Sequence, residues 1–221
     1  MNSTTPTTLV RSASSSRRTA RIVGFLFLAG FLAYGVGSTI ATNIAGSAES
    51  DGSGALLITG VALMLLTSAM VIGIGVLMFP ILRPHNEAIA VGYLGTRIFE
   101  GVVLAIGAVS LLVLTSPAAI DANFVAYNVA ETGLGIGSLF FCALLYRSGL
   151  VPRFLAAWGF LGYALFAAGS LLELFGVAGA GLVAAIPSGL FEVTFGIWLI
   201  ASGFRSTGTA VPSGPARESV S

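Results

Sequence analysis

Long apolar runs, separated by short polar or Gly- and Pro-containing segments, fill most of the chain. As a helix, such a run can cross a bilayer, because about 20 residues at roughly 1.5 Å each cover about 30 Å of hydrocarbon. The pattern predicts an all-α, polytopic membrane bundle of six transmembrane helices. Their predicted bounds are residues 22–41, 56–79, 92–114, 124–146, 154–175 and 182–204.

Two polar tails flank this apolar region. Residues 1–20 are rich in Ser and Thr and predict a disordered tail, residues 21–204 the six-helix domain, and residues 205–221 a second disordered tail. Ser16-Arg17-Arg18 faintly resembles a twin-arginine export signal, which is the alternative for the start of the chain. The first apolar run is longer than a signal-peptide core of about 7–15 residues. We therefore interpret it as an uncleaved first span.

Arginines outside the spans occur only in the tails and in alternate connections. The other connections carry Glu49, Asp51 and Asp121 and no basic residue. Because basic loops stay in the cytoplasm, we expect a multi-pass protein of the inner (plasma) membrane with both termini cytoplasmic. The arginines outside the spans are Arg11, Arg17, Arg18, Arg21, Arg83, Arg147, Arg153, Arg205 and Arg217.

The composition agrees with a membrane protein and excludes several other classes. Hydrophobic residues make up 56% of the chain and charged residues 9%, whereas a soluble domain is about a quarter charged. A net charge of +1 gives no reason to expect a nucleic-acid partner. All basic residues are Arg, which we interpret as the composition bias of a GC-rich bacterial genome.

Motifs for catalysis or cofactor binding are absent from the sequence. Its one cysteine, Cys142, and one histidine, His85, exclude an intrachain disulfide, a Cys/His zinc cluster and haem held by two histidines of one chain. There is no H-E-x-x-H, G-x-S-x-G or Walker motif. We therefore predict no catalytic residue, no cofactor and no metal site, and nothing here identifies an enzyme.

Ionisable side chains nevertheless lie within the predicted spans. Such a residue costs about 2.5–3.5 kcal/mol at a helix centre on insertion scales. Arg97 and Glu100 are three residues apart on the third span and therefore share a helix face. Glu131 lies on the fourth span, Glu173 near the outer end of the fifth, and Glu192 on the sixth.

Small and polar residues recur at helical spacing along the fourth span, at Asn128, Glu131, Gly135, Ser138 and Cys142. We expect this stripe to face the protein interior. Together with the ionisable residues it defines a candidate intramembrane polar site. Its predicted members are Arg97, Glu100, Asn128, Glu131, Ser138 and Glu192.

Two interpretations of these buried charges remain open. The site is either a polar cavity that binds a cation or moves protons, or a structural network in which the carboxyl groups are protonated and hydrogen-bond across helices. One Arg cannot neutralise four carboxylates, so some must be protonated, hydrated or partnered from outside the chain. We expect Arg97 to bond Glu100 within its helix, or to bridge it to a neighbouring span.

Pro187 lies close before Glu192 on the sixth span. In the first turn it would be an ordinary helix start. Further into the helix it would free backbone carbonyls near Glu192, as in the broken helices of transporters. We favour the first turn.

Three sequence blocks resemble a bacterial membrane-protein family catalogued as domain of unknown function 4386. The resemblance covers roughly residues 21–204, although Pro84 and Phe154 stand where a basic residue and Trp are expected. It implies a six-helix membrane protein and brings no established activity. The blocks are residues 79–87 with Gly92-Tyr93-Leu94, Arg97 and Glu100; residues 145–153 with Trp158-Gly159; and Pro187 with Leu190-Phe191-Glu192 and Trp198-Leu199-Ile200.

The sequence thus predicts a small transporter or ion- or proton-coupled permease that uses its buried carboxylates. The alternative is a non-catalytic membrane protein that regulates or assembles with a partner, and a weaker third class is an intramembrane enzyme acting on lipid. The expected partners are the lipid bilayer and a small ion or small-molecule ligand. The sequence sets no oligomeric state.

Overall fold

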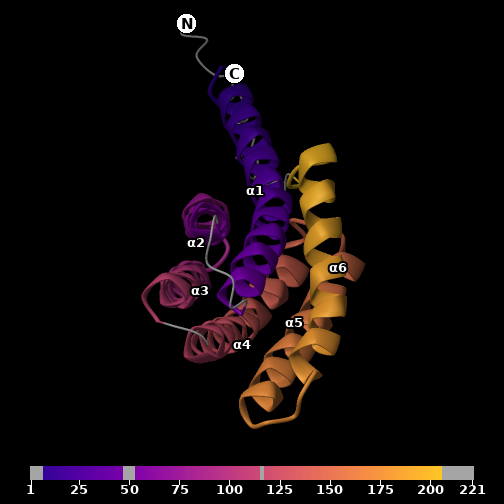
Figure 1. Ribbon diagram of the computed structural model, residues 1–221. Helices are drawn as coiled ribbons and strands as arrows, with labels where there is room; N and C mark the ends of the chain where they lie inside the picture. Colours follow the sequence, from indigo (N-terminus) through magenta and orange to yellow (C-terminus); the bar gives the residue numbers. More distant parts are fainter. Residues whose placement is uncertain (1–6, 47–52, 115–116, 206–221) are drawn as a thin grey trace, which may run out of the picture.

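The computed structural model describes residues 7–46, 53–114 and 117–205 (Figure 1). The predicted all-α fold is confirmed, since the described residues form six helices that are each long and apolar enough to cross a membrane. The helices are α1 (Thr7–Ala45), α2 (Ser53–Leu82), α3 (Glu87–Val113), α4 (Pro117–Ser148), α5 (Arg153–Leu174) and α6 (Ala180–Ala201).

Helix α1 begins well before the first predicted span. It starts at Thr7, inside the segment predicted as a disordered tail, and Ala20 is already fully buried. No Gly or Pro interrupts the chain between Thr7 and Val23, so the backbone hydrogen bonds of the helix continue through the polar residues. Residues 1–6 and 206–221 of the predicted tails lie outside the described part.

The helices pack in chain order, and α6 closes the ring against α1. The beginning of α1 and the end of α6 lie at the same end of the molecule (Figure 1), as an even number of crossings requires. We call this the arginine-bearing end, because the connections that join α2 to α3 and α4 to α5 also lie there, with Arg83 and Arg147. The other is the opposite end.

Local sequence signals set several helix ends. Gly149 follows α4 with φ of 68° and its N–H donates to the Leu145 carbonyl at 3.1 Å, while Pro152 stands directly before α5. This is the expected asymmetry of Gly after a helix and Pro before one. The Asn86 side chain accepts the Ile89 N–H at 3.0 Å and thereby caps α3.

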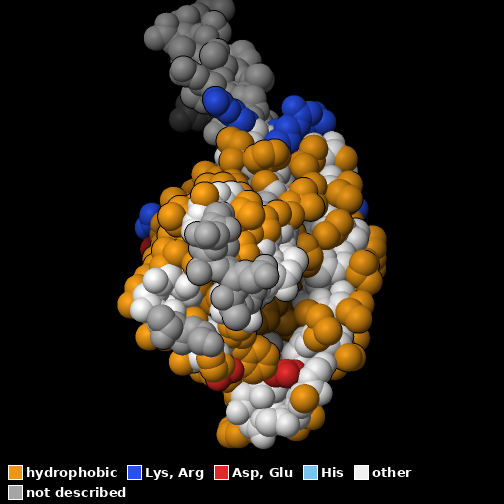
Figure 2. Space-filling view, in the orientation of Figure 1, with side chains coloured by type: hydrophobic (Ala, Val, Ile, Leu, Met, Phe, Trp, Pro, Cys, Tyr) orange, Lys and Arg blue, Asp and Glu red, His pale blue; other side chains and the backbone are white. Residues whose placement is uncertain are grey.

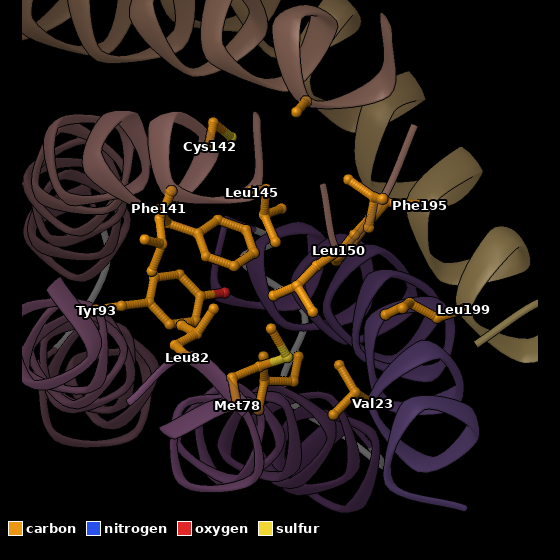
Figure 3. Close-up of a cluster of buried hydrophobic side chains, with 14 of the residues drawn as sticks. Val23, Met78, Leu82, Tyr93, Phe141, Cys142, Leu145, Leu150, Phe195 and Leu199 are labelled. Atoms are coloured by element: carbon orange, nitrogen blue, oxygen red, sulfur yellow. The ribbon is translucent and has the colours of Figure 1, made fainter. Parts of the chain in front are cut away.

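Apolar side chains cover both the outside and the arginine-bearing interior of the bundle. Large hydrophobic residues are exposed on every helix, which suits contact with lipid. Figure 2 shows hydrophobic side chains over much of one face. Inside the arginine-bearing end, residues of all six helices form one apolar cluster. Figure 3 shows Tyr93 and Phe141 face to face within it, with ring centroids 4.2 Å apart.

Candidate functional site

A cavity of about 210 Å³ lies among the helices, and all six contribute to its wall. Its charged lining consists of one guanidinium and three carboxyl groups, each near the middle of its helix. These groups come from α3, α4 and α6, and four of the six predicted site residues are therefore brought together. They are Arg97, Glu100, Glu131 and Glu192.

Arg97 lies at the boundary between the cavity and the apolar cluster, and only 2% of its surface is exposed. Its Nη1 donates to both carboxyl oxygens of Glu100, at 3.0 and 3.3 Å, and its Nε donates to the Tyr93 hydroxyl at 2.9 Å. The guanidinium also lies 5.1 Å from the centroid of the Phe27 ring. The predicted bond between Arg97 and Glu100 within one helix is confirmed.

Glu192 joins this network from α6. The Tyr163 hydroxyl donates to its Oε1 at 2.6 Å, and Arg97 Nη2 lies 4.0 Å from the same oxygen. In the described part of the chain, Nη2 is buried and makes no hydrogen bond. Arg97 therefore bonds one carboxylate closely and reaches toward a second on a neighbouring helix, so that α3, α5 and α6 share one polar network.

Glu131 stands apart from that network. It is 7% exposed and lines the cavity, yet its carboxyl group makes no hydrogen bond or ion pair with any described residue. Tyr127, one helical turn earlier, stacks on Tyr34 of α1 with ring centroids 5.5 Å apart, and both rings line the same cavity. Of the three carboxyl groups in the cavity wall, Glu131 is therefore the one without a partner among the described residues.

The predicted stripe on α4 is buried at all five positions, so its inward orientation is confirmed. Of these residues only Glu131 lines the cavity. Asn128 donates to the Phe124 carbonyl at 3.0 Å, and Ser138 is buried without a hydrogen bond among the described residues. A side chain on Gly135 would come within 2.7 Å of the Ala167 Cβ on α5, so much of the stripe serves close helix packing.

Glu173 has a structural role at the opposite end. Its Oε1 accepts the Gly179 N–H at 2.9 Å and its Oε2 accepts the Gly181 N–H at 2.8 Å. A carboxylate at this position satisfies backbone donors at the start of α6 and complements the positive end of the helix dipole. Glu173 does not line the cavity.

Pro187 lies inside α6 and not in its first turn. The helix starts at Ala180, two residues before the predicted bound, and Pro187 is therefore past the positions where a missing N–H is harmless. The Val183 carbonyl consequently lacks its usual helical donor. Ser188 and Glu192, which follow on the same helix, both line the cavity.

None of the tyrosines that surround the charges was predicted from the sequence as a site residue. Tyr93 could have been predicted as a partner of Arg97, because it lies four residues earlier on the same helix face. Tyr34, Tyr127 and Tyr163 could not, since each meets its partner across a helix interface or the cavity.

Comparison with known proteins places the chain in a family without assigning an activity. No curated protein and no solved structure matches it. The family model described as Domain of unknown function (DUF4386) matches residues 22–203, which include all six helices except the first part of α1. The chain therefore belongs to the DUF4386 family, and its six described helices support a multi-pass membrane protein.

Proposed function

We propose that the chain is a small proton- or ion-coupled permease whose cavity carboxylates bind the coupling cation. The observation that supports it is Glu131, which is buried in the cavity wall without a partner among the described residues. Intramembrane ionisable residues are costly and commonly mark ion or proton pathways. Glu100 supports the proposal less, because Arg97 bonds it within the same helix.

The charge count in the cavity favours uptake of positive charge. Glu131 shares the cavity with Glu100 and Arg97 of α3, with Glu192 of α6, and with the hydroxyls of Tyr34 and Tyr127. One guanidinium can balance one of the three carboxylates. The other two carboxylates must be neutralised by protons or by a bound cation. Exchange of a proton for a cation at such a group is the basis of coupled transport.

The proposal includes an orientation. We place the protein in the plasma membrane with its arginine-bearing end and both termini in the cytoplasm, because of the arginine distribution. Reporter fusions at Ser50, Asn86, Ala122, Ser148, Gly179 and the C-terminus would test it. Fusions at Asn86, Ser148 and the C-terminus should give cytoplasmic signals. An external signal from the C-terminal fusion would contradict the orientation.

Proteoliposomes that enclose a pH-sensitive dye provide the functional test. With an inward proton gradient and a clamped membrane potential, vesicles with the full chain should acidify faster than empty vesicles. Glu131→Gln should abolish this excess rate, because the amide keeps the side-chain shape and loses the ionisable oxygen. The matched control is Glu87→Gln, an exposed carboxylate that pairs with Arg83 outside the cavity.

The same measurement separates the competing function class. If neither a proton gradient nor a sodium or potassium gradient makes the vesicles differ from empty ones, the permease proposal is wrong. The chain would then be better described as a non-catalytic membrane component that assembles with a partner.

A further inference from the structure

We infer that the cavity binds a small organic monocation with an apolar body, its charged nitrogen at Glu131. The inference rests on the permease proposal and adds a substrate class to it. Three features of the cavity support it: the sign of the charges in the wall, their spread, and the size and chemistry of the remaining surface.

The wall charges select a cation. Three carboxyl groups face one guanidinium, and that guanidinium already bonds Glu100 and approaches Glu192. An anion would meet three carboxyl groups, and among the described residues the unbonded Nη2 of the one guanidinium already faces Glu192 Oε1 at 4.0 Å. Glu131, by contrast, offers two oxygens to a donor or a positive centre and has no partner within residues 7–46, 53–114 and 117–205.

The spread of these carboxyl groups favours an organic cation over a bare metal ion. Among the described residues, no three His, Cys, Asp or Glu side chains converge closely enough to hold a metal. Dehydrating a metal ion requires several oxygen ligands at once. A single carboxylate with aromatic neighbours instead suits an ammonium group, which also gains from the faces of aromatic rings.

The rest of the wall accommodates an apolar body. The cavity holds about 210 Å³, and an apolar protein cavity of about 150 Å³ takes up benzene. The aromatic rings in its wall come from α1, α4 and α5, and they are Phe27, Phe31, Tyr34, Tyr127 and Phe166. A ligand of one aromatic ring with a small ammonium group fits both the volume and the lining.

The cavity reaches the molecular surface between α1 and α6. Gly24 and Gly196 bring these helices into contact near the arginine-bearing end, and further along the Phe31 ring of α1 lies against Gly189 of α6. Beyond Phe31, Tyr34 of α1 stacks on Tyr127 of α4. Phe31, which is 50% exposed, and exposed Gly35 both line the cavity. Figure 2 shows this face hollowed between the two helices, so a membrane-soluble amine has a lateral path to Glu131.

The test is calorimetric titration of the purified full chain in detergent with benzyltrimethylammonium. Its uncharged carbon isostere, neopentylbenzene, is titrated in parallel, and micelles alone serve as the blank. The cation should bind, and Glu131→Gln should weaken binding about tenfold or more, because the neutral amide no longer attracts the positive charge of the quaternary ammonium, which has no N–H to donate. Glu87→Gln, on an exposed loop-side carboxylate, should bind like the parent.

A second pair of variants tests the cavity without changing charge. A side chain on Gly35 meets no atom within 4 Å, so Gly35→Leu should fold and fill the mouth of the cavity, abolishing binding. Gly95→Leu adds the same bulk on an exposed face of α3, where it also meets no atom within 4 Å, and should leave binding intact.

The outcomes keep the two proposals apart. Equal binding of neopentylbenzene, or no effect of Glu131→Gln, overturns the monocation inference. Proton flux through Glu131 without any binding of benzyltrimethylammonium also overturns it and leaves the permease proposal standing. Binding at Glu131 without flux supports the ligand class and contradicts transport.

Discussion

The two ends of the bundle are packed in different ways. At the arginine-bearing end, side chains of all six helices meet in one cluster, in which Phe141 lies between Tyr93 and Phe195. At the opposite end, the buried apolar cluster among the described residues draws on α1 to α4 and on neither α5 nor α6. Its buried members, none of them aromatic, are Ala41, Val61, Met64, Ala108, Leu111 and Ala119.

This difference indicates which end can open. The cavity lies between the two apolar clusters. The cluster formed by all six helices therefore closes it toward the arginine-bearing end. Regions with fewer buried apolar contacts open at lower free energy. The structure therefore combines a closed arginine-bearing end with a more weakly packed opposite end, where the described residues of α5 and α6 lie outside the buried apolar cluster.

The largest effect is expected at Arg97, at the base of the cavity. Arg97→Ala leaves Glu100 and Glu192 without their cation, and removing one side of a buried pair costs about 3–5 kcal/mol. Glu100→Gln should cost less, because a neutral amide still hydrogen-bonds. The measurement is unfolding of the purified protein in detergent.

A double change sharpens this prediction. Arg97→Leu combined with Glu100→Leu should recover much of the stability lost in Arg97→Ala, since two apolar groups need no partner. If Arg97→Ala melts like the parent, the ion pair between Arg97 and Glu100 does not stabilise the protein. The difference in packing between the two ends would then rest on their apolar clusters alone.

A medium effect is expected at the interface between α1 and α6 near the arginine-bearing end. A side chain on Gly24 would overlap the Gly196 carbonyl across the interface between α1 and α6. Gly24→Ala should therefore lower the free energy of unfolding by about 1–3 kcal/mol, the usual cost of overpacking. Gly92→Ala, whose added methyl meets no atom within 4 Å, is the control and should be neutral or slightly stabilising.

The smallest effect is expected at the opposite end. Glu173→Gln keeps one acceptor for the start of α6 but removes the charge that complements the helix dipole. The melting temperature should fall by less than in Gly24→Ala, and proton flux should stay unchanged. Asp121→Asn, an exposed carboxylate near the same end, controls for the charge change. A loss of flux in Glu173→Gln would place this residue in the transport pathway.

Sequence periodicity predicted the helices and part of the site for physical reasons that can be named. Membrane thickness fixes the length of an apolar run, and a spacing of three residues fixes a shared helix face, as for Arg97 and Glu100. The helical spacing of small and polar residues also predicted that the stripe on α4 faces the interior. It did not separate Glu131 from Asn128 and Ser138, because the difference between cavity wall and packed interface depends on what the neighbouring helix presents.

Helix bounds caused the remaining differences. Pro187 was expected in the first turn of α6, but the helix begins at Ala180, where Glu173 accepts the Gly179 and Gly181 N–H groups. Glu173 lies on α5 and caps the start of α6 across the turn between them, and a hydropathy pattern cannot predict such a hydrogen bond. The same holds for the bond from Tyr163 to Glu192, whose residues are far apart in the chain.

The pairing of Arg97 with Glu100 within a single helix matters before the bundle exists. A nascent chain enters the bilayer segment by segment, and each lone charge at a helix centre costs about 2.5–3.5 kcal/mol on insertion. Arg97, Glu100 and Tyr93 all belong to α3, so their bonds can form as soon as that helix coils. Tyr163 and Glu192, on helices synthesised later, are not needed at that stage. Helix α3 thus enters the membrane with its arginine already partnered, and the later helices complete the network around it.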